Sequence, residues 1–190
     1  MQQRRPQSSV MVGLLSLAVL VGVALTNSPA QADTGAGPYY APPSWDGTLP
    51  SAARFMVLTN FASAAVLDRE TGMVWERSPA ATTATWLSAR ETCIDKIVGG
   101  RKGWRVPSVF ELASLIDPSV AFETLALPTG HPFLNVQSGG FLYWSATTVA
   151  DGPTTAWDMD FRSPGDMEEV TKDSDQRFWC ARGGMNADQY

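Results

Sequence analysis

Residues 103-GWRVPSVFELASLID-117 decide the fold, because an aromatic loop runs there directly into a helix start. Ser108 and Glu111 have the Ser-x-x-Glu spacing of a capping box, in which the serine oxygen and the glutamate carboxylate each accept a backbone amide that lacks an intrahelical partner. This spacing predicts a helix that begins at Ser108. It ends near Asp117-Pro118, since proline cannot continue the hydrogen-bond ladder.

A longer helix is predicted upstream, starting near Thr83 or Thr85 and stopped by Gly99-Gly100, which can take the left-handed conformation common after helices. Its apolar residues recur at three- and four-residue spacing, so we expect them to share one core-facing side. These residues are Trp86, Ala89, Cys93, Ile94 and Ile97.

Short apolar and β-branched runs around these helices predict strands at 54–58, 65–68, 73–76, 141–148, 155–161 and 177–182. Asp68 and Gly72 fit a tight hairpin turn, with Asp68 accepting turn amides. In the run 155–161, strict alternation predicts Trp157 facing the core and Asp158 facing solvent, as for a half-buried strand. The acidic stretch 166–175 is expected to be an excursion between strands.

Residues 118–140 show little periodicity and several Pro and Gly, which predicts a long loop region inside the domain. Ordered loops of this length usually carry function. We therefore expect a binding face there, with rings able to stack on sugars or partner side chains. The candidate residues on this face are His131, Phe133, Phe141 and Tyr143.

The amino terminus carries Arg4 and Arg5, an apolar run over 10–25 and the small-x-small pattern Ala30-Gln31-Ala32. This predicts a signal peptide over 1–32; the alternative, a membrane anchor, would need a longer apolar run of about 20 residues. The Pro- and Gly-rich stretch 33–53 predicts a linker, 54–184 the domain and 185–190 a tail. After signal cleavage no membrane span is expected, and the protein is placed in the periplasm or at the cell surface.

The chain has two cysteines, Cys93 and Cys180, and an even number in an exported protein predicts a disulfide. The formal net charge is −5, and the predicted signal segment removes only basic residues, so the exported domain is more acidic still. This charge argues against nucleic acid as a partner. The basic cluster Arg101, Lys102 and Arg105 has two interpretations: an anion contact, or a solvated loop in which Arg105 is bonded inside the fold.

Seven motifs in order carry a family resemblance: VLDRETGMVW at 66–75, TWLSA at 85–89, GWRVPS at 103–108, ELASLID at 111–117, YWS at 143–145, AW at 156–157 and CARG at 180–183. Together they resemble the C-terminal domain of the Legionella collagen-like adhesin, over about 54–184. The resemblance implies an α+β, C-type lectin-like fold with two helices, a small antiparallel sheet, a long loop region and a disulfide from the first helix to the last strand. It also implies a surface binding module, since that adhesin recognises sulfated glycosaminoglycans.

This chain departs from the adhesin in two respects, since it has no collagen-like Gly-x-y repeat and is acidic. A single histidine, His131, and no Gly-x-Ser-x-Gly motif argue against a hydrolase, and bonded cysteines argue against thiol chemistry or a zinc site. The acidic residues follow no EF-hand spacing. We therefore expect no cofactor, no metal and no enzyme. The expectation is an exported binding or adhesion module for a glycan or an envelope protein, or alternatively a self-associating assembly domain.

Overall fold

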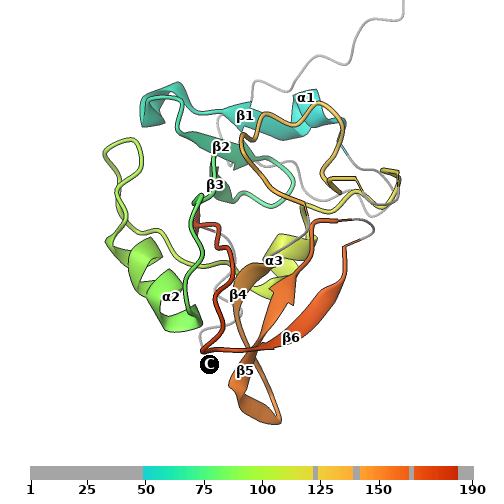
Figure 1. The fold of residues 1–190 in the computed structure, drawn as a ribbon. Coiled ribbons are helices and arrows are strands. Elements are labelled where there is room, and N and C mark those ends of the chain that lie inside the picture. The colour runs from blue at the N-terminus through green and yellow to red at the C-terminus, as the bar shows by residue number, and fades with distance from the viewer. Residues whose placement is uncertain (1–48, 122–123, 139–141, 163–164, 184–190) are drawn as a thin grey trace, which may run out of the picture. The chain divides into compact units, whose positions relative to one another are not determined.

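The computed structural model describes residues 49–121, 124–138, 142–162 and 165–183 (Figure 1). The predicted signal peptide and tail, most of the predicted linker, and Phe141 lie outside these ranges. The elements follow in the order α1 (Ser51–Arg54), β1 (Phe55–Val57), the 3-10 helix η1 (Thr59–Phe61), β2 (Ala65–Asp68), β3 (Val74–Glu76), α2 (Trp86–Asp95), α3 (Val109–Ala113), β4 (Tyr143–Val149), β5 (Gly152–Met159), β6 (Met167–Thr171) and β7 (Ala181–Arg182). The mixed α+β class is confirmed.

Two antiparallel sheets form, where the sequence predicted one. The first has the strand order β1-β2-β3-β7, and the second is the meander β4-β5-β6. The predicted hairpin joins β2 to β3: Gly72 has φ +71°, and the Asp68 carboxylate accepts the amide of Glu70 at 3.0 Å. The turn assignment of Asp68 is therefore confirmed.

The capping box at the start of α3 is also confirmed. The Ser108 hydroxyl accepts the Glu111 amide at 3.2 Å, and the Glu111 carboxylate accepts the Ser108 amide at 2.8 Å. The α-helix is shorter than predicted, because after Ala113 the bonds tighten to three-residue spacing, from Leu115 to Leu112 and from Ile116 to Ala113. The turn still ends before Pro118.

The predicted core face of α2 is wrong in part. Ala89 and Cys93 are fully buried, but Ile94 and Ile97 are 60% and 59% exposed. The helix ends at Asp95, so Ile97 lies beyond it, and Gly99-Gly100 form a separate turn instead of the helix stop. Ala89 and Cys93 stand four residues apart and form the buried stripe of this helix, whereas Ile94 falls outside that stripe.

Two predictions in the second sheet are corrected. The acidic stretch is not a simple excursion, since β6 pairs along β5 from Met159↔Met167 to Thr155↔Thr171. Asp158 does not face solvent but is fully buried, because β5 is the central strand and is covered on both faces. Backbone pairing with a neighbouring strand outweighs the low strand propensity of acidic residues here.

The segment 176–182 connects the two sheets, since it starts beside β4 and ends as β7 in the first sheet (Figure 1). Its Arg177 backbone bonds to Leu142 and Trp144 beside β4, and Ala181 bonds to Arg105. Only its last two residues form the predicted final strand, β7. Alternate side chains of the segment enter two separate hydrophobic clusters: Trp179 and Ala181 in one, Phe178 and Cys180 in the other. This segment thus joins both halves of the core.

Candidate functional site

The loop before Trp104 is held rigidly. The backbones of Val98 and Arg101 bond to each other across Gly99 and Gly100, whose φ values are +56° and +75°. Positive φ at both central residues is the requirement of a type I′ turn. The Arg101 carbonyl also accepts the Trp104 indole N–H at 2.8 Å. These bonds fix where the next side chains point.

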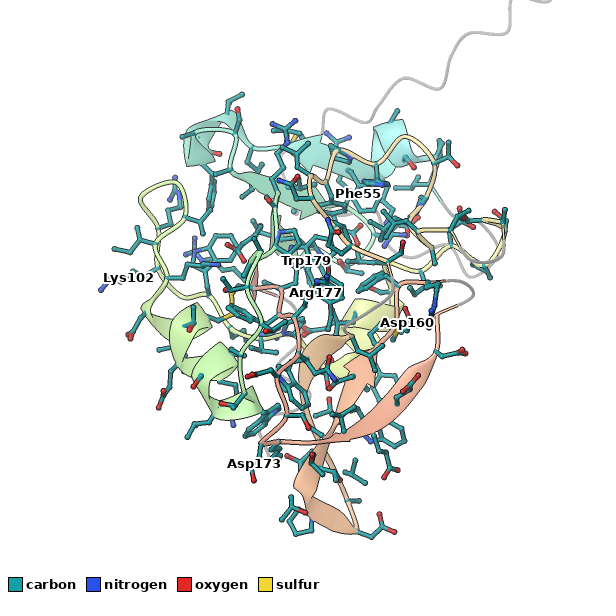
Figure 2. The ribbon with its side chains drawn as sticks, in the orientation of Figure 1. Phe55, Lys102, Asp160, Asp173, Arg177 and Trp179 are labelled. Carbon is teal, nitrogen blue, oxygen red and sulfur yellow. A yellow bond between two sulfur atoms is a disulfide. The ribbon has the colours of Figure 1, made fainter. Side chains whose placement is uncertain are left out.

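Three cations lie on or beside the segment 101–103 that follows this turn, and we call Arg101, Lys102 and Arg182 the basic corner. Arg101 stacks on Phe61, with its guanidinium carbon 4.7 Å from the ring centroid. Arg182 lies close to Gly103, where a Cβ would stand 3.6 Å from its Nε. Lys102 is exposed and points away from the domain (Figure 2). Within the described part of the chain, none of the three has a carboxylate partner.

Arg105 does not belong to this group. Its guanidinium binds both oxygens of Glu111, at 2.7 and 2.6 Å, and donates to the Gly183 carbonyl at 2.7 Å. The same Glu111 carboxylate closes the capping box, so Arg105 ties the loop to the helix start and to the end of β7. The structural interpretation of Arg105 is confirmed, while the roles of Arg101 and Lys102 as ligand contacts stay predictions.

Arg182 was missed from the sequence. It stands 80 positions from Lys102, and the antiparallel pairing Val74↔Arg182 together with the Arg105↔Ala181 bridge brings it to the turn. No local spacing signals such a neighbour. The predicted pairing of Cys93 with Cys180 gives the one hint, because Cys180 lies two residues before Arg182 and Cys93 lies shortly before the turn.

Among the described residues, the aromatic face predicted around the loop region is packed into the core. Phe133 and Tyr143 are 5% and 1% exposed, and both rings pack against Trp179, at centroid distances of 4.9 and 6.2 Å. The Tyr143 hydroxyl accepts the Gln137 amide at 2.8 Å. Stacking on a ligand would require both rings to leave the core, so their predicted role is not available in this structure. Phe141 lies outside the described residues.

His131 lies half-buried against Phe133, with 5.8 Å between the ring centroids. Its Nδ1 is buried and, among the described residues, has no hydrogen-bond partner. Burial lowers the pKa of this imidazole, because desolvation disfavours the charged form. An inward, unpartnered nitrogen is a poor contact for an external ligand, and the binding role of His131 stays a prediction.

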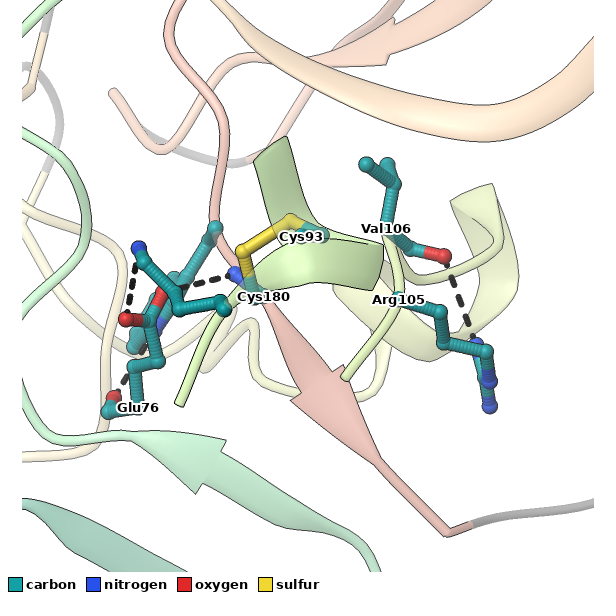
Figure 3. The surroundings of a disulfide bond; sticks show 7 residues. Glu76, Cys93, Arg105, Val106 and Cys180 are labelled. Atoms are coloured by element: carbon teal, nitrogen blue, oxygen red, sulfur yellow. Dashed lines mark hydrogen bonds and ion pairs between the residues drawn. A yellow bond between two sulfur atoms is a disulfide. The ribbon is translucent and has the colours of Figure 1, made fainter. Parts of the chain in front are cut away.

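The predicted disulfide joins Cys93 on α2 to Cys180, with a Cα–Cα distance of 5.5 Å, and both residues are fully buried (Figure 3). Glu76 lies beside it: one carboxylate oxygen accepts the Cys180 amide at 3.1 Å, and the other pairs with Lys96 at 2.7 Å. Burial raises the pKa of Glu76, opposed by the bond and the charge of Lys96. Neither cysteine is a free thiol.

Among the described residues, no group of three or more His, Cys, Asp or Glu side chains is arranged to hold a metal ion. Within the same ranges, no helix has both the length and the apolar character needed to cross a membrane.

The fold and the site define a disulfide-tied α+β domain with a cationic turn and a packed aromatic core. The model of the Lcl C-terminal domain matches residues 64–182, and the chain belongs to this family. The match spans β2 through β7 and both cysteines, so the family assignment covers most of the described core. No curated protein matches the chain.

Proposed function

We propose that this domain is the binding module of an exported protein and that it holds an anionic partner, a glycan or an envelope or surface protein, at the basic corner. The observation that carries the proposal is that Arg101, Lys102 and Arg182 lie on or beside one short segment and have no carboxylate partner among the described residues, in a chain of net charge −5. Cations held together against the overall charge focus a local positive potential that attracts anions.

The rigidity of the corner supports this role. Arg101 is held by its stacking on Phe61 and by the type I′ turn, so little conformational entropy is lost when it meets a ligand. Arginine also binds carboxylate, sulfate or phosphate oxygens through two parallel donors. A C-type lectin-like relationship and a position outside the cytoplasm form part of the same proposal, and the buried disulfide supports an oxidising compartment.

The proposal includes no catalysis, cofactor or nucleic-acid partner. Both cysteines are joined in the disulfide, and His131 turns its Nδ1 inward. These features support binding over chemistry, because a nucleophile or a general base must be exposed to its substrate.

A glycan array carrying neutral, carboxylated and sulfated chains, together with envelope protein fractions, tests the proposal. The double variant Arg101→Gln/Lys102→Gln should weaken binding to anionic probes about tenfold or more and reduce its dependence on salt. The matched control Arg90→Gln/Lys172→Gln removes two cations that lie over Trp86 instead. Equal loss in both variants, or binding to neutral probes alone, would contradict the basic corner as the site.

One observation favours a second candidate function, assembly through self-association. Leu87, Ile94 and Ile97 are each about 60% exposed and lie along or just after α2. Apolar side chains grouped on a surface commonly mark contacts with other proteins. Light scattering over a range of concentrations tests this: a discrete oligomer that Leu87→Gln/Ile94→Gln dissociates, with no glycan bound, would favour assembly.

A further inference from the structure

The second sheet encloses a carboxyl group with no partner. Asp158 lies on β5, the central strand of β4-β5-β6, and is fully buried. Both of its carboxyl oxygens lack a hydrogen-bond partner among the described residues. Buried polar groups are nearly always bonded, and an unpaired buried carboxylate is so costly that the group keeps a proton instead. Asp158 therefore requires an explanation beyond packing.

The strands beside Asp158 set its surroundings. Across β4 it lies opposite Trp144, and across β6 it lies directly opposite Glu168. Ala156 and Val170 belong to the same cluster as Trp144, so this face of the sheet is apolar on the Ala156 side of Asp158. Of the two residues directly opposite Asp158, the one that carries a charge is Glu168, which is also an acid.

The cations near this face are already engaged. Arg162 binds Asp160, and the Lys172 amine donates to the Thr148 hydroxyl and the Pro153 carbonyl. Arg90 on α2 stacks over Trp86. The charged groups that the strands and α2 bring to this side of the sheet are Asp160, Arg162, Asp166, Glu168, Lys172 and Arg90.

Desolvation raises the pKa of Asp158 to about 8, and the charge of Glu168 adds to the rise. Directly opposite residues of an antiparallel pair have Cβ atoms about 5 Å apart. The Glu168 side chain is exposed, and among the described residues no hydrogen bond joins it to Asp158.

We propose that Asp158 keeps its proton while β6 lies beside it with Glu168 opposite, and that loss of this proton at rising pH opens β6 from β5. When the proton leaves Asp158 for a solvent base, only its O–H bond breaks, and two carboxylates then face each other across the strands. Their repulsion and the buried charge open β6, the edge strand of the sheet. The pair is a pH-sensitive latch, and it stands independently of the binding proposal.

The sign follows from linkage. Asp158 binds its proton more tightly in the closed sheet than in an open or unfolded chain, where an Asp titrates near pH 4. The closed state is therefore favoured at low pH, and the favour is lost as the pH rises through about 8. Each pH unit between about pH 4 and pH 8 raises the opening equilibrium up to about tenfold, and the rise ends above about pH 8. Opening of β6 should therefore increase roughly a hundredfold between pH 6 and pH 9.

Carboxyl ¹³C NMR titration of the full chain tests the latch directly. We expect the Asp158 midpoint near pH 8, moving to lower pH in Glu168→Gln. A midpoint near pH 4 would overturn the proposal. An unchanged midpoint in Glu168→Gln would also overturn it, because burial alone would then account for the shift.

Amide hydrogen exchange of β6, corrected for intrinsic rates, measures the opening. Asp158→Asn keeps a donor without a titrating proton, so its exchange protection should not change between pH 6 and pH 9. The matched control Glu169→Gln alters the next residue, which lies opposite Trp157, and should behave as the wild type. The same pH dependence in Asp158→Asn and wild type would refute the latch; should Asp158→Asn not fold, the titration above still decides.

Discussion

At the scale of single residues, Arg54 is a buried cation bonded to several parts of the described structure. It binds Asp68 through Nε and an Nη, at 2.9 and 2.7 Å, contacts Glu70 at 3.0 Å and donates to the Ser114 carbonyl at 2.7 Å. Arg54 and Asp68 are 4% and 0% exposed. This one side chain therefore connects the end of α1, the hairpin after β2 and the end of α3.

We predict that Arg54→Met destabilises the domain by about 3 to 5 kcal/mol, because it leaves the Asp68 carboxylate buried and unpaired. Urea denaturation followed by tryptophan fluorescence measures the change. Lys102→Met is the control, an exposed cation without an ion pair, and should change stability by less than about 0.5 kcal/mol. A loss below about 1 kcal/mol in Arg54→Met would show that the pair contributes little.

Ser108 gives a second prediction at this scale. Its hydroxyl accepts the Glu111 amide, so Ser108→Ala should cost about 1 kcal/mol by removing the helix cap. Urea denaturation again measures it, beside Ser88→Ala on the exposed side of α2 as the control. Since Glu111 also holds Arg105, the effect would exceed this figure only if the loss of the serine disturbs that ion pair.

At the scale of elements, the turn at Gly99-Gly100 contains two glycines with the same backbone requirement and different surroundings. A Cβ at Gly99 would lie 2.4 Å from the Phe61 backbone, whereas nothing lies within 4 Å of one at Gly100. Both have positive φ. The two positions thus separate steric contact from backbone strain.

We predict that Gly100→Ala costs about 1 kcal/mol, the strain of a left-handed alanine. Gly99→Ala should cost several times more, because η1 must move away from the turn. Thermal unfolding of both variants measures the difference. Equal destabilisation would mean that the Phe61 backbone yields freely, and the rigid presentation of Arg101 would then lose its support.

Elements with local signals were predictable from the sequence, and those formed by distant partners were not. The capping box, the β2–β3 hairpin and α2 depend on residues a few positions apart, so their chemistry is visible in the chain. The strand β6 was missed because Met167, Glu168 and Glu169 have no strand pattern, and only pairing with β5 holds them. Arg182 and the buried Asp158 depend likewise on neighbours supplied by other strands.

At the scale of the whole domain, the segment 176–182 is the element on which both halves of the core depend. Trp179 packs against Trp75, Phe133, Tyr143 and Phe161, and its indole donates to the Glu76 carbonyl at 2.8 Å. Phe178 and Cys180 enter the other cluster. The disulfide anchors this segment to α2, so cross-linking, sheet pairing and core packing coincide there.

We predict that loss of the disulfide destabilises the domain by about 4 to 5 kcal/mol. The bond closes a loop of 87 positions, and in the chain-entropy account a cross-link of this length restricts the unfolded chain by about that amount. Urea denaturation with and without reductant measures the loss, and Cys93→Ala/Cys180→Ala should reproduce the reduced protein. A fall below about 1 kcal/mol would mean that the packing of Trp179 and Phe178 holds the segment without help. The turn that bears Arg101 follows directly from α2, the helix that Cys93 anchors. A reduced domain that loses stability but keeps its anion binding would therefore show that the bridge serves the fold alone.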